Sequence, residues 1–166
     1  SYETHIKEFQ KRNIPVAVYA YVAAKDKKEM EKEAEEFYQA SKKYKPTYYW
    51  LDVEEKTMDD MNAGVEAFRA KLESLGAKNI GIYIGTYFME EHSISTDKFT
   101  ALWIPTYGYD DGYYNAAPST DNEYDLHQYT SQGQLNGFTH YLDLNQIAPT
   151  QDQEKIYRKL FTVEKN

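Results

Sequence analysis

Three carboxylates stand where apolar segments of the chain end. Asp52 and Glu54 follow an uncharged aromatic run in YYWLDVEE, residues 48–55, and Asp143 lies within LDLN. Side chains of a strand alternate with a period of two, so Asp52 and Glu54 project to one side, with Cα atoms about 6.5 Å apart. Carboxylates held this close raise each other's proton affinity, so that one can keep a proton near neutral pH while the other stays ionised.

Such a group of acids suits two kinds of chemistry. Cleavage of a glycosidic bond requires an acid that protonates the leaving oxygen and a negative charge near the anomeric carbon as it becomes oxocarbenium-like. Three acids at one mouth could instead hold a divalent metal ion. Histidines do not support a transition-metal site, because all four are scattered singly and none lies in the D-x-E stretch; they are His5, His92, His127 and His140.

The elements that must position these acids alternate along the chain. Apolar runs predict strands at 14–22, 48–53, 79–85 and 100–105. Apolar spacings of three and four predict helices at 3–12, 26–44 and 57–75, with a capping box at Thr57 and Asp60 and a helix end at Gly76. A short helix is expected to fill 86–92. The run 14–22 has the composition of a strand covered on both faces. The alternation predicts an α/β fold with a parallel sheet, whose working face lies at the carboxyl ends of the strands.

The last part of the chain departs from this rhythm. Residues 106–123 are rich in Gly, Asp, Tyr and Pro and predict a long loop. Strands at 124–129 and 138–144 leave no room for a helix between them and predict a hairpin, and a short helix is expected at 152–161.

Composition narrows the possible functions. The 166 residues suit one domain, there is no cysteine, and no apolar run approaches the roughly 20 residues of a membrane span. The net charge is −8 and residues 101–150 contain no Lys or Arg, which makes nucleic acid a poor partner. The 17 tyrosines and two tryptophans fit a packed core, and those near strand ends also suit the apolar faces of sugar rings.

Four segments, in this order and at this spacing, resemble the family 25 glycoside hydrolases, the Chalaropsis-type lysozymes that also serve as phage endolysins. They are YWLDVEE, GIYIGTYF, ALWIPTYG and DLHQYTSQGQLNGFTHYLDLNQI, and the resemblance runs from about residue 1 to about residue 147. It implies an irregular, TIM-like (β/α) barrel. Residues 1–149 would form the catalytic domain, and residues 150–166 a C-terminal helical tail packed on it.

The resemblance also implies an activity. Family members of this kind are N-acetylmuramidases that cut the β-1,4 bond between N-acetylmuramic acid and N-acetylglucosamine in peptidoglycan, with no cofactor or metal, using the substrate's own N-acetyl group as nucleophile. Glu54 matches the general acid, Asp52 its partner, and Asp143 the acid of the closing D-L-N. Expected substrate-binding residues, for which core packing is an equal explanation, are Tyr21, Tyr83, Tyr87, Trp103, Tyr107, Gln128 and Tyr129.

One departure from the family pattern concerns the beginning of the sequence. Family members start with a strand that carries a further acid in a D-x-S segment, followed by a helix and a second strand, and the given sequence starts after these. The resemblance therefore implies an open apolar sheet edge, which a missing N-terminal segment or a partner chain would complete.

The expected location is outside the cell or at the cell wall, for a bacterial or phage-encoded protein, although no signal peptide opens the given chain. Membrane insertion is not expected. Two other functions stay open: a glycan-binding module of the cell wall that does not cut, and a metal-dependent enzyme that modifies polysaccharide.

Overall fold

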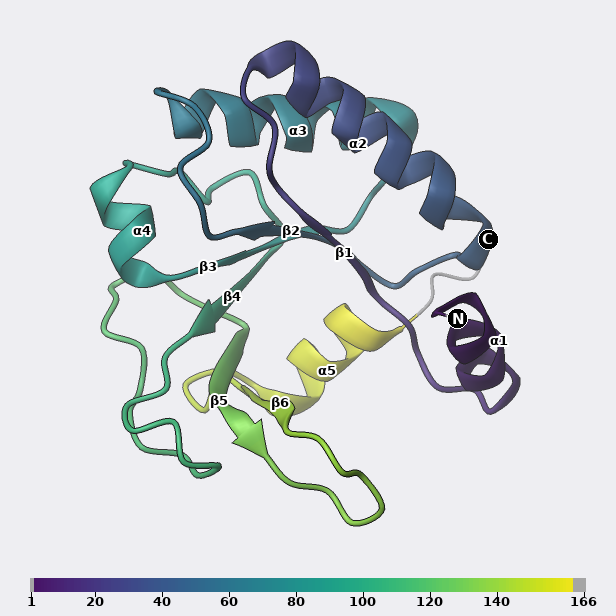
Figure 1. Cartoon of the computed structure of the whole chain (residues 1–166), viewed down its shortest axis with the longest axis vertical. Helices are drawn as coiled ribbons and strands as arrows, with labels where there is room; N and C mark the ends of the chain where they lie inside the picture. Colours follow the sequence, from purple (N-terminus) through teal and green to yellow (C-terminus); the bar gives the residue numbers. More distant parts are fainter. Residues whose placement is uncertain (1, 163–166) are drawn as a thin grey trace.

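A computed structural model of the chain describes residues 2–162 and shows an α/β fold built on one curled sheet (Figure 1). The six strands lie in the order β1-β2-β3-β4-β5-β6; β1 to β5 are parallel, and β6 runs antiparallel to β5. The elements are α1 (Tyr2–Lys11), β1 (Val18–Tyr21), α2 (Lys27–Ser41), the 3-10 helix η1 (Lys42–Tyr44), β2 (Tyr49–Val53), α3 (Met61–Leu75), β3 (Ile80–Ile84), α4 (Thr86–Glu91), β4 (Ala101–Pro105), β5 (Leu126–Gly133), β6 (Leu142–Ile147) and α5 (Gln153–Phe161).

The two faces of the sheet are covered differently. Helices α2 and α3 lie together on the outer face, where Met30 and Phe68 are fully buried against Leu51 of β2 (Figure 1). Burial of each such side chain contributes about 1.5–3 kcal/mol. On the inner face, Ile156 and Leu160 of α5 pack in a second, smaller cluster that covers the half of the sheet nearer the amino ends of the strands. The other half of the inner face, at the carboxyl ends, stays open for a site.

Local chemistry explains where the two outer helices begin and end. The carboxylate of Asp26 accepts from the backbone N–H of Glu29 and caps α2. Asp60 does the same for α3 by accepting from Ala63, and Gly76 ends α3 with a positive φ of 113°. The capping box predicted at Thr57 is wrong, because helix α3 starts only after Asp60.

Strand β1 differs from its prediction in length and in burial. It covers Val18–Tyr21 only, and the prediction that both of its faces are covered is wrong, because Tyr19 is 67% exposed and Tyr21 48% exposed. Within residues 2–162, β1 forms its ladder with β2 alone. Its outward residues pack on the outer core, whereas its two tyrosines stand on the open half of the inner face.

The predicted C-terminal hairpin is present, but its strands lie further along the chain. β5 extends to Gly133 and β6 starts at Leu142, so the predicted bounds 124–129 and 138–144 are wrong. The pairing shifts register between Gln128 and Thr130 and again before Gly133. A Cβ at Gly133 would lie 2.3 Å from Cγ of Leu144, so this close approach of the strands requires glycine. Residues 131–133, which were predicted to belong to the turn, are the last part of strand β5.

Two further observations concern the periphery. Residues 163–166, the end of the predicted C-terminal tail, lie outside the described residues. Among the residues described, no helix has the length and apolarity that crossing a membrane would require.

Candidate active site

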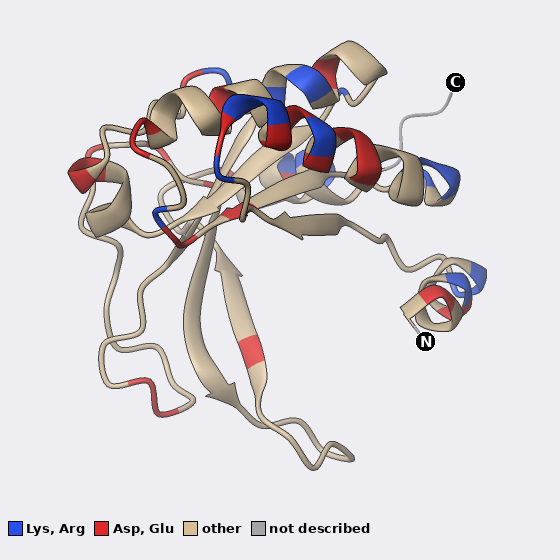
Figure 2. Cartoon of the chain, turned by 45° about the horizontal axis from the view of Figure 1, so that its top comes forward, with Lys and Arg blue, Asp and Glu red and all other residues tan. Residues whose placement is uncertain are grey.

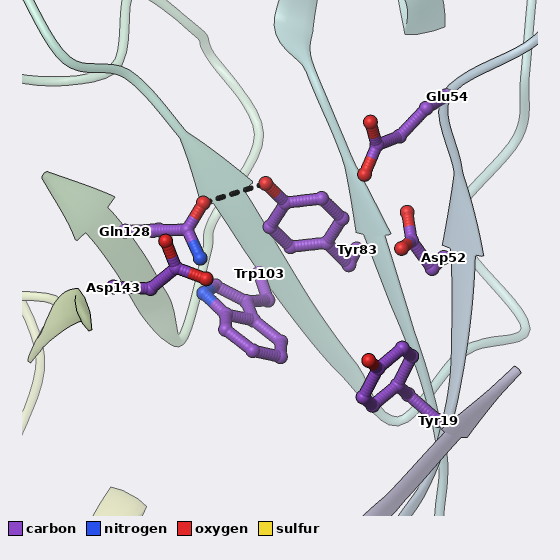
Figure 3. Close-up of a pocket in the computed structure, with 7 residues that line it drawn as sticks. All are labelled: Tyr19, Asp52, Glu54, Tyr83, Trp103, Gln128 and Asp143. Carbon is purple, nitrogen blue, oxygen red and sulfur yellow. Dashed lines mark hydrogen bonds between the residues drawn. The ribbon is translucent and has the colours of Figure 1, made fainter. Parts of the chain in front are cut away.

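Strand β2 delivers the acid pair to the open half of the inner face. Tyr49, Leu51 and Val53 point outward into the core, so the period of two sends Trp50 and Asp52 inward, and Glu54 follows just past the strand end. Figure 3 shows the carboxylates of Asp52 and Glu54 facing the same cavity. The sequence thus buries the apolar half of the strand and exposes its acids.

The cavity that these acids line is small and is built by the whole sheet. It has a volume of about 160 Å³, and every one of the six strands supplies a lining residue, from β1 to β6 in turn: Tyr19, Asp52 with Glu54, Tyr83, Trp103, Gln128 and Asp143. Asp52 pairs in register with Tyr83, and Tyr83 with Trp103, so these side chains stand in one row across the sheet. Parallel strands with matched register therefore bring together residues far apart in the sequence.

The environment of Asp52 sets its protonation. Its Oδ1 atom is buried and has no hydrogen-bond partner in the described part of the chain. Burial, and next the neighbouring Glu54 carboxylate, raise the pKa of Asp52 to about 7. Near neutral pH the pair Asp52 and Glu54 therefore holds a proton that an isolated carboxylate would have lost. A pair with such a proton can act as a general acid.

Asp143 reaches the cavity because β6 runs backwards. It is the second residue of β6, and in an antiparallel strand the start lies at the carboxyl edge of the parallel ones. Two residues further along the same face, Oδ1 of Asn145 accepts the indole N–H of Trp103 at 2.8 Å. The ring of Trp103 also packs edge-on against Tyr83, with centroids 4.9 Å apart. Trp103 is therefore held on two sides with part of its ring exposed to the cavity.

A second hydrogen-bonded group lies beside Asp143 and Trp103, across the cavity from Asp52 and Glu54 (Figure 3). Oε1 of Gln128 accepts the hydroxyl of Tyr83 at 2.6 Å and also the hydroxyl of Tyr107. Tyr107 does not line the cavity itself; it contacts the site through Gln128.

The other expected aromatic residues lie outside the cavity. Tyr21 stands next to Asp52 in register on β1, and its hydroxyl donates to Oε2 of Glu55 at 3.3 Å. Tyr87 on α4 is 76% exposed. Tyr129 points to the far face of β5 and packs near Tyr114, with ring centroids 6.0 Å apart.

Two residues at the site were not predicted from the sequence. Tyr19 lines the cavity, and Asn145 holds Trp103. A signal existed for both, because Tyr19 is two residues from Tyr21 and Asn145 is two residues from Asp143, so each shares a strand face with a residue that was chosen.

Charge is distributed unevenly over the fold. Figure 2 shows most Lys and Arg residues on the helices. In the loop after β4 and in strand β6, the charged residues are all Asp or Glu. The lining of the cavity includes three carboxylates and no Lys or Arg. Among residues 2–162, no group of three or more His, Asp and Glu side chains is arranged to hold a metal ion.

A curled α/β sheet whose carboxyl edge presents paired carboxylates beside exposed aromatic rings has the groups that a glycoside hydrolase needs. The sequence model of the glycosyl hydrolases family 25 matches residues 1–138. Comparison with curated proteins gave no match. The chain belongs to glycosyl hydrolase family 25.

Solved structures agree with this assignment. GHIP, a glycosyl hydrolase 25 of Streptococcus pneumoniae described as a virulence factor in host cell invasion, is 64% identical with a TM-score of 0.94; the match covers 96% of this chain and 70% of GHIP. The catalytic domain of endolysin ply40 from bacteriophage P40 of Listeria monocytogenes is 27% identical with a TM-score of 0.84, covering 95% of this chain and 77% of the other. The CTP1L endolysin, 22% identical with a TM-score of 0.76 over 95% of this chain and 54% of its own, shares the fold.

Proposed function

We propose that the protein is an N-acetylmuramidase that cleaves the β-1,4 bond between N-acetylmuramic acid and N-acetylglucosamine in peptidoglycan, and that it acts outside the cell or at the cell wall. The observation that carries this proposal is the pair Asp52 and Glu54, which faces a cavity lined by aromatic rings in a family 25 chain. The similarity to an endolysin catalytic domain supports peptidoglycan as the substrate.

In the proposed reaction Glu54 protonates the leaving oxygen, because it stands past the end of β2 and is exposed to the cavity mouth. Asp52 keeps the shared proton available, since its raised pKa of about 7 holds a proton where Glu54 can receive it. The 2-acetamido oxygen of the substrate attacks the anomeric carbon as the bond to the leaving oxygen breaks. Water then opens the cyclic intermediate, returning a proton to the pair.

The other lining residues bind and stabilise the sugar. Asp143 faces the pair from the opposite side of the cavity and supplies negative charge for the positively charged transition state (Figure 3). Tyr19 and Trp103 offer ring surface for stacking against the apolar face of a pyranose. The side-chain NH₂ group of Gln128 donates a hydrogen bond to the sugar.

The deciding experiment compares Glu54→Gln with a matched control, Glu123→Gln, which changes an exposed loop glutamate. Purified cell walls are digested, and new reducing ends are reduced with borohydride and identified after acid hydrolysis. Muramitol from the unaltered protein and from the control, with none from Glu54→Gln, supports the proposal. Glucosaminitol as the product contradicts the bond assignment, and unchanged lysis by Glu54→Gln contradicts the role of Glu54.

The same digest separates cutting from binding alone. A protein that sediments with cell walls but releases no reducing ends is a glycan-binding module, and the hydrolase proposal fails. The pair also predicts the pH response: kcat/KM falls as pH rises through about 7, because above this value Asp52 loses its proton. An activity that is constant from pH 6 to pH 9 would contradict the acid role of the pair.

A further inference from the structure

The amide of Gln128 is fixed in one orientation at the cavity wall. The residue is 5% exposed, and Oε1 accepts two hydroxyl hydrogen bonds, from Tyr83 at 2.6 Å and from Tyr107. An amide oxygen has two lone pairs, so both are in use. In this arrangement the amide turns its oxygen toward the two hydroxyls, and an exchange of oxygen and NH₂ would break both of these bonds. Nε2 is therefore the part of the amide that remains for a ligand in the cavity (Figure 3).

The two tyrosines that hold this amide are themselves fixed. Tyr83 belongs to β3 and packs edge-on against Trp103. Two hydrogen bonds tie the segment that carries Tyr107 to β5. The N–H of Thr106 donates to the carbonyl oxygen of Gln128 at 3.0 Å, and Nε2 of the buried His127 donates to the carbonyl oxygen of Thr106 at 2.7 Å. Burial raises the pKa of both tyrosine hydroxyls, which therefore remain donors.

The rest of the cavity lining offers few donors. Asp52, Glu54 and Asp143 accept hydrogen bonds when ionised, and the indole N–H of Trp103 is already bonded to Asn145. The hydroxyl of a sugar can donate to these carboxylates. A carbonyl oxygen on the sugar cannot, because it only accepts. Apart from the proton that Asp52 shares with Glu54, the donors left on the wall are the hydroxyl of Tyr19 and the NH₂ group of Gln128. Of these two, Tyr19 is 67% exposed, whereas Gln128 is buried and held by two hydrogen bonds.

We propose that Gln128 recognises the acetamido group of the sugar by donating from Nε2 to its carbonyl oxygen. Tyr83 and Tyr107 are positioning residues in this scheme: they act through Gln128 by fixing which end of the amide faces the sugar. The inference rests on the proposed function, because it assumes that an acetamido sugar occupies the cavity. It assigns Tyr107 a role other than stacking on a sugar ring.

A double-mutant cycle tests the positioning role. Gln128→Leu is expected to lower kcat/KM about tenfold, and Tyr107→Phe about threefold to fivefold, mainly through KM. In the Gln128→Leu background, Tyr107→Phe should have no further effect, because the amide that it orients is gone. Tyr109→Phe, on the same loop and 88% exposed, is the matched control. Thermal unfolding of each variant checks that the fold is kept. Losses that multiply in the double variant overturn the positioning role.

The variant Gln128→Glu tests whether the group that faces the sugar must be a hydrogen-bond donor. An ionised carboxylate turns the donor into an acceptor, whereas a protonated carboxyl group can donate again. The ratio of kcat/KM between this variant and the unaltered protein should therefore rise as pH falls, and the ratio for Gln128→Leu should stay flat. A flat ratio for Gln128→Glu overturns the assignment of Nε2 as the donor.

The ligand group is tested by binding in the Glu54→Gln background, using chitotetraose and its de-N-acetylated counterpart. Gln128→Leu should weaken binding of the acetylated oligosaccharide about tenfold and leave the other unchanged. An equal loss for both shows that a sugar hydroxyl accepts the bond, and it overturns the acetamido assignment. These outcomes are distinct from failure of the proposed function, which shows as absent wall cleavage by the unaltered protein.

Discussion

Replacing Asp52 by Asn is expected to make the protein more stable at neutral pH while removing the acid pair. The folded state raises the pKa of Asp52 from 3.8 to about 7, since its carboxyl group is partly buried beside Glu54 and Oδ1 has no hydrogen-bond partner within the described residues. Between these two values the folded protein binds more protons than the unfolded chain. Its free energy of unfolding therefore decreases as pH rises from about 4 to about 7.

The size of this effect follows from the shift. About three pKa units at 1.36 kcal/mol each give an upper value of about 4 kcal/mol. Because Asp52 keeps some contact with solvent and shares its proton with Glu54, we expect roughly half of this, about 2 kcal/mol. In a chain of this length that corresponds to about 4–8 °C in Tm. Asn has nearly the same shape as Asp and carries no charge, so Asp52→Asn does not lose this free energy as pH rises.

The measurement is thermal or urea unfolding of the two proteins at pH 4, 5.5, 7 and 8. The Tm difference in favour of Asp52→Asn should grow across this series and level off above pH 7. Asp59→Asn, which changes an exposed acid of the next loop, is the control and should show no such growth. A difference that is constant with pH, or that grows in the opposite direction, would refute the reasoning that burial of the charge is unfavourable to the fold. A gain in stability together with lost activity is a common signature of a catalytic residue.

Two further predictions concern residues that hold the site in place. Asn145→Ala removes the acceptor for the indole N–H of Trp103, at a cost of about 1 kcal/mol, and is expected to raise KM about fivefold with kcat within a factor of two. Asp110→Asn should lower Tm at pH 7, because the carboxylate accepts from the Thr130 hydroxyl and from both the N–H and the hydroxyl of Ser131; these bonds hold the pKa of Asp110 below its usual value. That stability is present above about pH 4 and is lost as pH falls further, so the Tm difference should shrink in acid.

Matched controls separate these effects from general damage. Asn136→Ala changes an exposed asparagine in the β5–β6 hairpin and should leave KM unchanged. Asp110 has a positive φ of 49°, which Asn tolerates, so Asp110→Asn tests the charge rather than the backbone. An unchanged KM in Asn145→Ala would show that the indole needs no anchor. A Tm difference in Asp110→Asn that persists at pH 3 would show that charge is not the cause.

The architecture was largely predictable because the helices and strands follow from the spacing of apolar residues close together in the sequence. Met30, Ala34 and Phe68 mark the buried faces of α2 and α3 by their spacing, and both helices were predicted close to their observed bounds. The alternation of strands and helices predicted the parallel sheet. The predictions that failed depend on distant contacts: the cover of β1 depends on which elements lie beside it, and the ends of β5 and β6 depend on two register shifts in their pairing.

At the site, residue spacing alone shows which acids share a strand face. The period of two places Asp52 and Glu54 together, and no other part of the chain is needed for that. Two other features depend on long-range contacts. Oδ1 of Asp52 is buried without a partner in the described region, and Gln128 is held by hydroxyl groups 45 and 21 residues away. Periodicity fixes the direction of a side chain, whereas its proton affinity and hydrogen bonds depend on neighbours that the fold brings from elsewhere in the chain.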